Sequence, residues 1–169
     1  MRQAHDNYDK GEHIKEVFAY FGRAYYTANL FETGLAIALK REGVHSLDRY
    51  ETEFDTFMKK QHAQTLGNLL KRFEKHNTAD TKLKTMLAEA KDKRDFIAHH
   101  YFRERAEEFA TRVGRDSMIA ELDASTTVFD EADEAIQAVV APRLASIGVS
   151  VEHMESHIKR YVESFDTDD

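Results

Sequence analysis

Apolar side chains recur every three or four residues along most of the chain, a spacing that predicts amphipathic α-helices rather than strands. Two long helices are predicted over 11–41 and 47–76, and a third follows an N-cap at Asn77-Thr78. A charged helical segment is predicted over 102–113 and ends at Gly114. A long helix then begins at the cap Asp116-Ser117, and Pro142 ends or kinks it. A short last helix covers 149–164. The predicted fold class is all-α: an antiparallel four-helix bundle with an additional C-terminal helix.

The apolar stripes of two predicted helices each contain one charged side chain. Eight apolar residues of the first helix share one face: Ile14, Phe18, Phe21, Tyr25, Ala28, Leu35, Ala36 and Leu39. Glu32 falls in the middle of this stripe, and Arg94 lies within about 20° of the stripe of the third helix. A buried charge without a partner costs several kcal/mol. We therefore expect Arg94 to face Glu32, a cleft or another subunit.

The composition narrows the class of protein. A single Pro in 169 residues favours helix, and the absence of Cys excludes disulfides, thiolate metal sites and cysteine nucleophiles. No Gly-rich phosphate loop occurs, which makes a nucleotide-binding α/β fold a poor candidate. No stretch is long and apolar enough to span a membrane, and the polar N-terminus lacks an apolar signal core. We therefore expect a cytoplasmic protein with no membrane contact. We predict a single helical domain over 11–164, between a flexible N-terminus over 1–10 and a disordered acidic tail over 165–169.

The net charge of −7 argues against broad coating of nucleic acid, but the charge is unevenly distributed. The segment 82–105 carries seven basic and four acidic side chains, whereas residues 120–169 carry three basic and twelve acidic ones. A locally basic segment within an acidic chain suits a confined anionic ligand better than a long duplex. A solvated helix face explains the same pattern, so charge alone leaves both interpretations open.

The segment KRDFIAHHYF, residues 93–102, combines Arg94 and the adjacent Asp95 with His99 and His100 after an apolar stretch. It resembles the motif of the HEPN family, which is Arg, a polar residue, and then His four to six residues after the Arg. An early helix with Glu in its stripe (ANLFETGLAIAL), the TLG of the second helix and GRDSMIAEL after the motif are also similar to prokaryotic HEPN-type proteins. The resemblance covers residues 10–140, and Asp95 stands where Asn is common.

This resemblance implies a HEPN-like helical bundle that dimerises, so that the motifs of two chains face each other across a cleft. Many HEPN proteins are metal-independent endoribonucleases of toxin–antitoxin and phage-defence systems, and others are non-catalytic. For this chain the resemblance implies a homodimer, an RNA substrate, a cognate antitoxin protein, and neither cofactor nor metal. Arg94 would bind and stabilise the scissile phosphate, His99 or else His100 would be the general acid or base, and Asp95 and Glu32 would orient or charge-balance the site.

The residue types themselves are compatible with RNA cleavage without a metal. An imidazole titrates near neutrality and can act as base or acid, and a guanidinium offers phosphate a bidentate fork. Arg94 and His99 point about 140° apart on one straight helix, so they cannot meet at one phosphate. Either the helix breaks near Ala98 or the site combines residues of two chains. Tyr101, on the stripe near Arg94, is either a core residue or a hydroxyl donor in the cleft.

Two other interpretations stay open. A non-catalytic HEPN-like interaction module would bind RNA or a protein partner through the same cleft, and it would tolerate a buried histidine or an occluded cleft. His153 and His157 stand at i and i+4 in EHMESH, a spacing that can hold Zn or Ni, although such a pair on a terminal helix is more often simply solvent-exposed.

Overall fold

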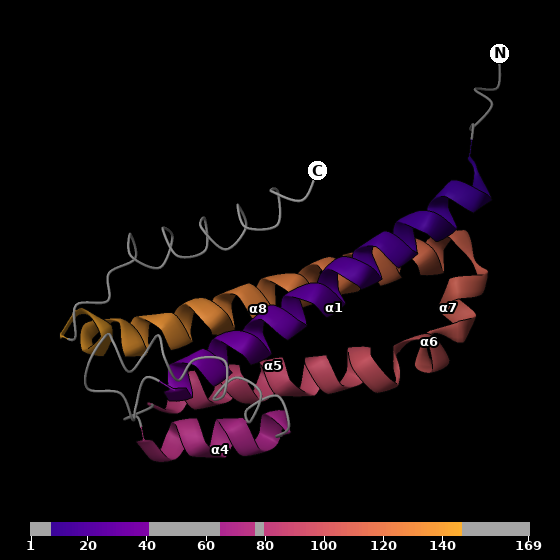
Figure 1. Cartoon of the computed structure of the whole chain (residues 1–169). Helices are drawn as coiled ribbons and strands as arrows, with labels where there is room; N and C mark the ends of the chain where they lie inside the picture. The colour runs from indigo at the N-terminus through magenta and orange to yellow at the C-terminus, as the bar shows by residue number, and fades with distance from the viewer. Residues whose placement is uncertain (1–7, 41–64, 77–79, 147–169) are drawn as a thin grey trace, which may run out of the picture. The chain divides into compact units, whose positions relative to one another are not determined.

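The structure is a computed structural model that describes residues 8–40, 65–76 and 80–146. Every regular element in these ranges is an α-helix and no strand occurs among them, so the all-α prediction is confirmed. The helices are α1 (Lys10–Lys40), α4 (Leu66–His76), α5 (Thr81–His99), α6 (Tyr101–Glu104), α7 (Ala106–Ala110) and α8 (Arg112–Ser146), labelled as in Figure 1.

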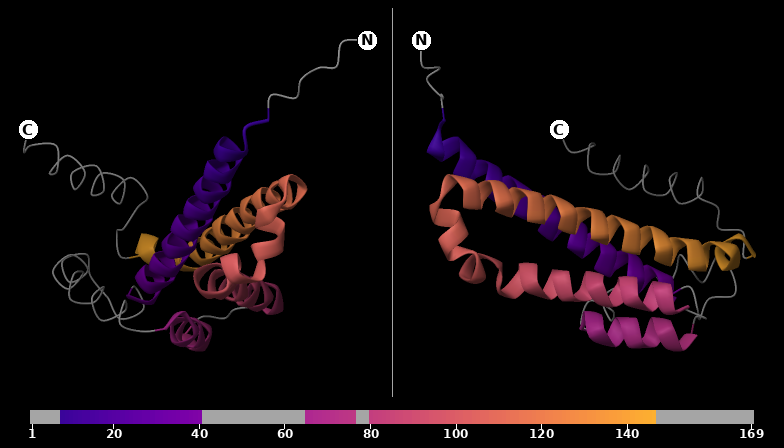
Figure 2. Two further views of the ribbon diagram at one scale, coloured as in Figure 1. Left: turned by 90° about the vertical axis from the view of Figure 1, so that its right-hand side faces the viewer. Right: turned by 180° about the vertical axis from the view of Figure 1, so that it is seen from behind.

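The chain divides into two compact units, and both long helices contribute to each of them. The first unit comprises residues 1–33 and 79–134, and the second comprises 34–78 and 135–169. Within the first unit, Figures 1 and 2 show α1, α5 and α8 side by side, with the short α6 and α7 connecting the end of α5 to the start of α8. The motif residues Arg94, Asp95, His99 and His100 lie in this first unit, together with Glu32 and Tyr101.

The core of the first unit forms where its three long helices meet. The rings of Phe31 on α1 and Phe129 on α8 lie 6.3 Å apart, centroid to centroid. The buried apolar side chains of this unit are Val17, Ala24, Ala28, Phe31, Leu83, Leu87, Ala90, Ile97, Tyr101, Met118, Leu122, Phe129 and Ala132. Each large member stabilises the fold by roughly 1.5–3 kcal/mol relative to an exposed side chain.

The second unit has a buried apolar set of its own. On α4 the buried residues follow helical spacing: Leu66, Leu69, Leu70 and Phe73. The ends of α1 and α8 in this unit bury Leu35, Ala36, Ala38, Leu39, Ile136 and Val140. The second predicted helix is therefore seen over 66–76, and its expected start at 47 lies outside the described residues.

The apolar stripe predicted for α1 is wrong at two positions of its N-terminal half, Phe18 and Tyr25, whereas Ile14 and Phe21 are half-buried. Phe18 and Tyr25 are exposed to 51% and 46%, whereas the smaller Val17 and Ala24 are buried. The predicted members Ala28, Leu35, Ala36 and Leu39 in the C-terminal half are buried. The reason is that α1 is apolar on two adjoining faces, and the face with the smaller side chains packs into the core. The large aromatic side chains stay near the surface.

The start of α5 differs from the prediction. Its N-cap is Asp80, whose carboxylate accepts a hydrogen bond from the backbone N–H of Leu83 at 2.8 Å. A carboxylate at this position satisfies one of the free N–H groups of the first turn, as Asn77-Thr78 was expected to do.

The segment that was predicted as one helix over 102–113 forms the two short helices α6 and α7. The long helix α8 begins at Arg112, so Asp116-Ser117 is not its cap and Gly114 lies inside its first turn. A Cβ added at Gly114 would collide with the carbonyl oxygen of Glu108, so the close approach of α7 requires glycine here. At the other end, α8 continues through Pro142 to Ser146 instead of ending there.

The described residues do not test every sequence prediction. The short helix over 149–164, the flexible N-terminus over 1–7 and the acidic tail over 165–169 lie outside them. The four-helix arrangement and the single domain over 11–164 therefore stay predictions. Across 8–40, 65–76 and 80–146, no helix has both the length and the apolar character of a membrane span.

Candidate active site

Arg94 lies partly buried between α5 and α1, held by two carboxylates. Its Nη2 donates to Oε2 of Glu32 at 2.8 Å, and its Nη1 donates to Oδ1 of Asp95 at 3.1 Å. The side chains of Arg94 and Glu32 are 25% and 18% exposed. The structure thus shows one of the three surroundings that the sequence left open for Arg94, an ion pair with Glu32 across two helices.

Lys91 extends this ion pair into a network of four charged side chains. Its Nζ donates to Oδ2 of Asp95 at 2.8 Å, one helical turn away. Partial burial acts to raise the pKa of Asp95, but hydrogen bonds from Lys91 and Arg94 outweigh it and hold that pKa below its ordinary value. Burial acts to lower the pKa of Arg94, and the charge of Glu32 outweighs it, so this pKa is raised. Arg94 therefore stays fully charged beside an ionised Asp95.

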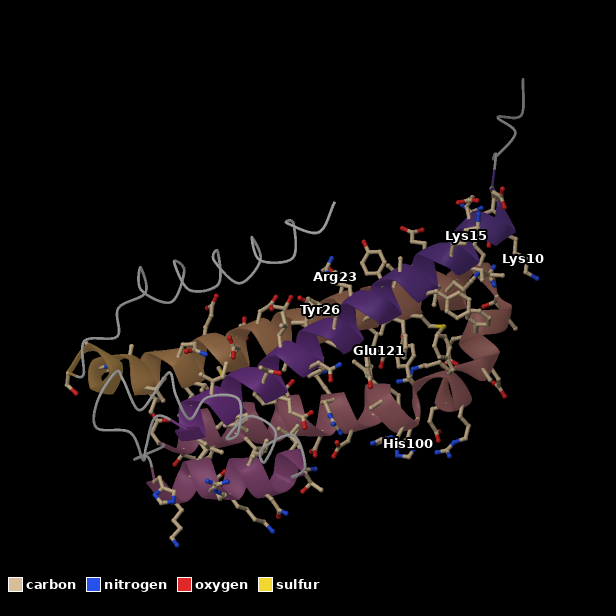
Figure 3. The ribbon with its side chains drawn as sticks, in the orientation of Figure 1. Lys10, Lys15, Arg23, Tyr26, His100 and Glu121 are labelled. Carbon is tan, nitrogen blue, oxygen red and sulfur yellow. The ribbon has the colours of Figure 1, made fainter. Side chains whose placement is uncertain are left out.

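His99 and His100 are exposed at the end of α5. His99 is the last residue of α5, and His100, with φ of −130°, separates α5 from α6. Their ring centroids lie 6.1 Å apart. In Figure 3, His100 sits at this junction and points away from α1. Both imidazoles are accessible, which an acid or base needs in order to reach a substrate.

Arg103 fixes the tautomer of the neutral His100 imidazole. Its Nη2 lies 2.9 Å from Nδ1 of His100. A guanidinium can only donate, so Nδ1 accepts and the proton of the neutral ring sits on Nε2. His100 thereby presents an N–H to solvent from a ring that is held in place.

A single chain does not bring Arg94 and the histidines together. The helix ends after His99 and not before it, so Arg94 and His99 share one helix and point about 140° apart. Among the described residues, no hydrogen bond or ion pair joins Arg94 to His99 or His100. The helix does end near Ala98, but only after His99, so this break does not turn His99 relative to Arg94, and a site shared by two chains stays a prediction.

Tyr101 is a core residue of the first unit. Its side chain is 2% exposed, and its hydroxyl donates to the backbone carbonyl of Met118 at 3.1 Å. Burial raises the pKa of Tyr101 well above its ordinary value of 10.0. A hydroxyl that is buried, bonded and hard to ionise supports α5 and α6 against α8 and is not positioned to serve a substrate.

Sequence reasoning missed the two basic residues that complete this surface. Lys91 contacts Asp95 at spacing i,i+4, and Arg103 contacts His100 at spacing i,i+3. Both spacings are the ones at which helical side chains meet, so a search for charged pairs one turn from the motif residues would have found them.

A second polar cluster lies where α1 and α8 begin. His13 is 8% exposed, with Tyr8 at its Nδ1 (3.1 Å) and Asp116 at its Nε2 (3.2 Å). Buried Arg115 donates to the carbonyl of Phe109 at 2.7 Å and to the hydroxyl of Tyr8. The adjoining cavity of about 800 Å³ is lined by more carboxylates than cations: Asp9, Glu12, Glu16 and Asp116 against Lys15 and Arg112. This cluster ties the N-terminal ends of the two helices together and repels phosphate.

A metal site is not found within the described ranges. No group of three or more His, Asp or Glu side chains there could hold an ion, and His153 and His157 lie outside those ranges. The chain matches no protein-family model, no curated protein and no solved structure.

Proposed function

We propose that this protein is a HEPN-like metal-independent endoribonuclease whose active sites form at a homodimer cleft. The observation that carries the proposal is Arg94, which is held half-buried by Glu32 and Asp95 on a helix that ends at the exposed His99, with the exposed His100 directly after it. A guanidinium held rigidly near the surface suits phosphate recognition. A role as a toxin or phage-defence effector, with a cognate antitoxin as partner, follows from the family resemblance.

The proposed reaction needs only these side chains and the RNA. One imidazole removes the proton of the 2′-hydroxyl, whose oxygen attacks the adjacent phosphorus. Arg94 stabilises the charge that builds up on the non-bridging phosphate oxygens. The bond from phosphorus to the 5′-oxygen breaks as a second imidazole donates a proton to that oxygen. The products are a 2′,3′-cyclic phosphate and a free 5′-hydroxyl.

The ion pairs of Arg94 predict a narrow substrate. Both Nη atoms of Arg94 already donate to carboxylates, and the negative charges of Glu32 and Asp95 oppose a phosphate, although a guanidinium has five N–H groups to donate. The net charge of −7 also disfavours loosely bound RNA. An RNA held by further contacts, such as a folded loop, meets both conditions better than an unstructured strand does.

The test is cleavage of a mixed pool of structured RNAs in EDTA. Wild-type protein is expected to produce 2′,3′-cyclic phosphate ends. Arg94→Ala and the double variant His99→Ala/His100→Ala are each expected to lose about 100-fold or more of the rate. Arg23→Ala and His76→Ala, which change exposed residues outside the site, are the matched controls and should retain wild-type rates. Cleavage that persists in the Arg94→Ala variant would contradict the proposal, and loss of wild-type cleavage in EDTA would point to a metal.

A second candidate function is a non-catalytic HEPN-like module that binds RNA or a protein through the same surface. It is favoured by the two carboxylates that already hold Arg94 and by the bond that ties His100 to Arg103. RNA that binds without being cleaved, with an affinity that falls in Arg94→Ala, would establish this alternative.

A further inference from the structure

A strip of aromatic side chains lies at the surface where α1 contacts α6. We define this aromatic strip as Phe18, Phe21 and Tyr25 on α1 together with Phe102 on α6. The ring centroid of Phe102 lies 5.5 Å from that of Phe18 and 4.7 Å from that of Phe21. Phe18 and Tyr25 are 51% and 46% exposed. The other two rings are half-buried, so they hold the exposed ones in place.

The aromatic strip leads along α1 toward the ion pair of Arg94. Glu32, whose carboxylate accepts from Arg94 at 2.8 Å, stands seven residues after Tyr25. Seven residues are close to two helical turns, so Tyr25 and Glu32 share one face of α1 and lie about 10 Å apart along its axis. At its other end, the strip contacts Phe102 through Phe21. Tyr25 therefore lies between the contact with α6 and the guanidinium of Arg94, on one side of the first unit.

The rings of the strip suit a flat aromatic ligand. Phe21 and Tyr25 are nearly parallel, with an angle of 17° between their planes and centroids 6.2 Å apart. A flat ring laid on Tyr25 is therefore close to parallel with Phe21 as well. Proteins recognise single-stranded RNA by stacking its unpaired bases on such side chains. Each stacked base contributes about 1–3 kcal/mol to binding.

The size of the strip favours single bases over a protein partner. From their exposed fractions, Phe18 and Tyr25 present roughly 200 Å² together. A standard protein interface buries about 800 Å² per partner, whereas a base needs only the face of one ring. The next aromatic residue, Tyr26, is turned about 100° away around α1 and projects into open space in Figure 3, so it does not extend the strip.

We infer that the aromatic strip stacks unpaired bases of an RNA loop whose phosphate binds Arg94. The inference deepens the proposed function by naming the substrate class, and it rests on that function for the phosphate. The net charge of −7 and the carboxylates of Glu32 and Asp95 weaken the attraction for phosphate. Stacking acts on the base, so it adds affinity that these carboxylates do not oppose. Only unpaired bases can stack in this way, so the strip selects a loop over a duplex.

Binding of a hairpin RNA tests the strip, in full-length His99→Ala/His100→Ala protein so that the RNA stays intact. The probe is a fluorescently labelled hairpin with a loop of adenosines, compared with the same hairpin whose loop riboses carry no bases. By fluorescence anisotropy, the adenosine loop is expected to bind about 10-fold or more tightly than the loop without bases. Tyr25→Leu keeps an apolar side chain but removes the ring, so it should lose most of this difference, whereas Tyr25→Phe should keep it. Tyr26→Leu, which removes the neighbouring ring outside the strip, is the matched control and should bind as the parent protein does.

Three results would overturn the inference. They are equal affinity for the two loops, a loss in Tyr25→Leu no greater than in Tyr26→Leu, and binding of neither hairpin, which would leave the strip as a surface for a protein.

Cleavage kinetics separate this inference from the proposed function. For an RNA that wild type cleaves from the mixed pool, Tyr25→Leu is expected to raise KM about 10-fold and to raise it more than it lowers kcat, because stacking contributes to binding and not to proton transfer. Wild-type KM in Tyr25→Leu, with no cleavage by Arg94→Ala, would overturn the role of the strip and leave the proposed function standing. Base-dependent binding through Tyr25 without any cleavage by wild type would instead contradict the nuclease and support the strip as a surface for bases.

Discussion

The ion pair between Arg94 and Glu32 should be worth more than an ordinary surface pair, and its strength can be measured. Exposed ion pairs contribute about 0.2–1 kcal/mol, whereas removing one partner of a fully buried pair costs about 3–5 kcal/mol. Arg94 and Glu32 lie between these limits because their side chains are 25% and 18% exposed. We expect a coupling free energy of about 1–2 kcal/mol between the two side chains.

A double-mutant cycle isolates this coupling. The free energy of unfolding is measured by urea denaturation for wild type, Glu32→Ala, Arg94→Ala and the double variant. Glu32→Ala alone should lower stability by about 2 kcal/mol, which corresponds to roughly 4–8 °C in Tm for a chain of this size. The single variant costs more than the coupling because it leaves Arg94 half-buried with Asp95 as its only carboxylate.

The matched control is the pair Arg23 and Asp123, which joins α1 and α8 at 2.7 Å but is 53% and 55% exposed. Its cycle should give no more than about 0.5 kcal/mol. The two pairs have nearly the same N···O distance, so the comparison isolates the effect of burial. A coupling for Arg94 and Glu32 that does not exceed the control value would refute the reasoning.

Three further variants have outcomes that the structure specifies. Tyr101→Phe should cost about 1 kcal/mol in thermal unfolding, because the bond to the Met118 carbonyl is lost, and should leave RNA cleavage unchanged. The pKa of Asp95 is lowered in the folded state, so the ionised carboxylate stabilises the fold fully above its ordinary pKa of 3.8, and this stabilisation is lost as the pH falls through the lowered pKa. Asp95→Asn should therefore make the free energy of unfolding depend less on pH in acid. An unchanged dependence on pH would contradict this. Gly114→Ala should lower the free energy of unfolding, measured in urea, by more than about 1 kcal/mol, because the alanine Cβ would collide with the Glu108 backbone. Alanine has the better helix propensity, so neutral or improved stability would refute the close approach.

The pairing of Arg94 with Glu32 was within reach of the sequence. Each residue interrupts an apolar stripe, and a charge in such a place needs a partner. The sequence could not choose between Glu32, a cleft and another subunit, because that choice depends on how two helices are rotated against each other. The structure adds Asp95, the next residue in the chain, whose carboxylate accepts a hydrogen bond from Nη1 of Arg94.

The face of α1 that packs inward could not be predicted. Both Val17 and Phe18 are apolar, and periodicity favoured the line with larger side chains. The structure buries the line through Val17 and Ala24, because small residues let the neighbouring helices come close. The break between α6 and α7 had no marker either, since no glycine or proline occurs between His99 and Thr111.

In the proposed site, Arg94 of one chain acts with the histidines of another. Subunit complementation tests this claim directly, by mixing Arg94→Ala protein with His99→Ala/His100→Ala protein under conditions that exchange subunits and assaying RNA cleavage in EDTA. Half of the randomly formed dimers are mixed, and each mixed dimer regains one of its two sites, so about a quarter of wild-type activity should return. A mixture as inactive as the two variants separately, while mass spectrometry shows mixed dimers, would contradict the shared site.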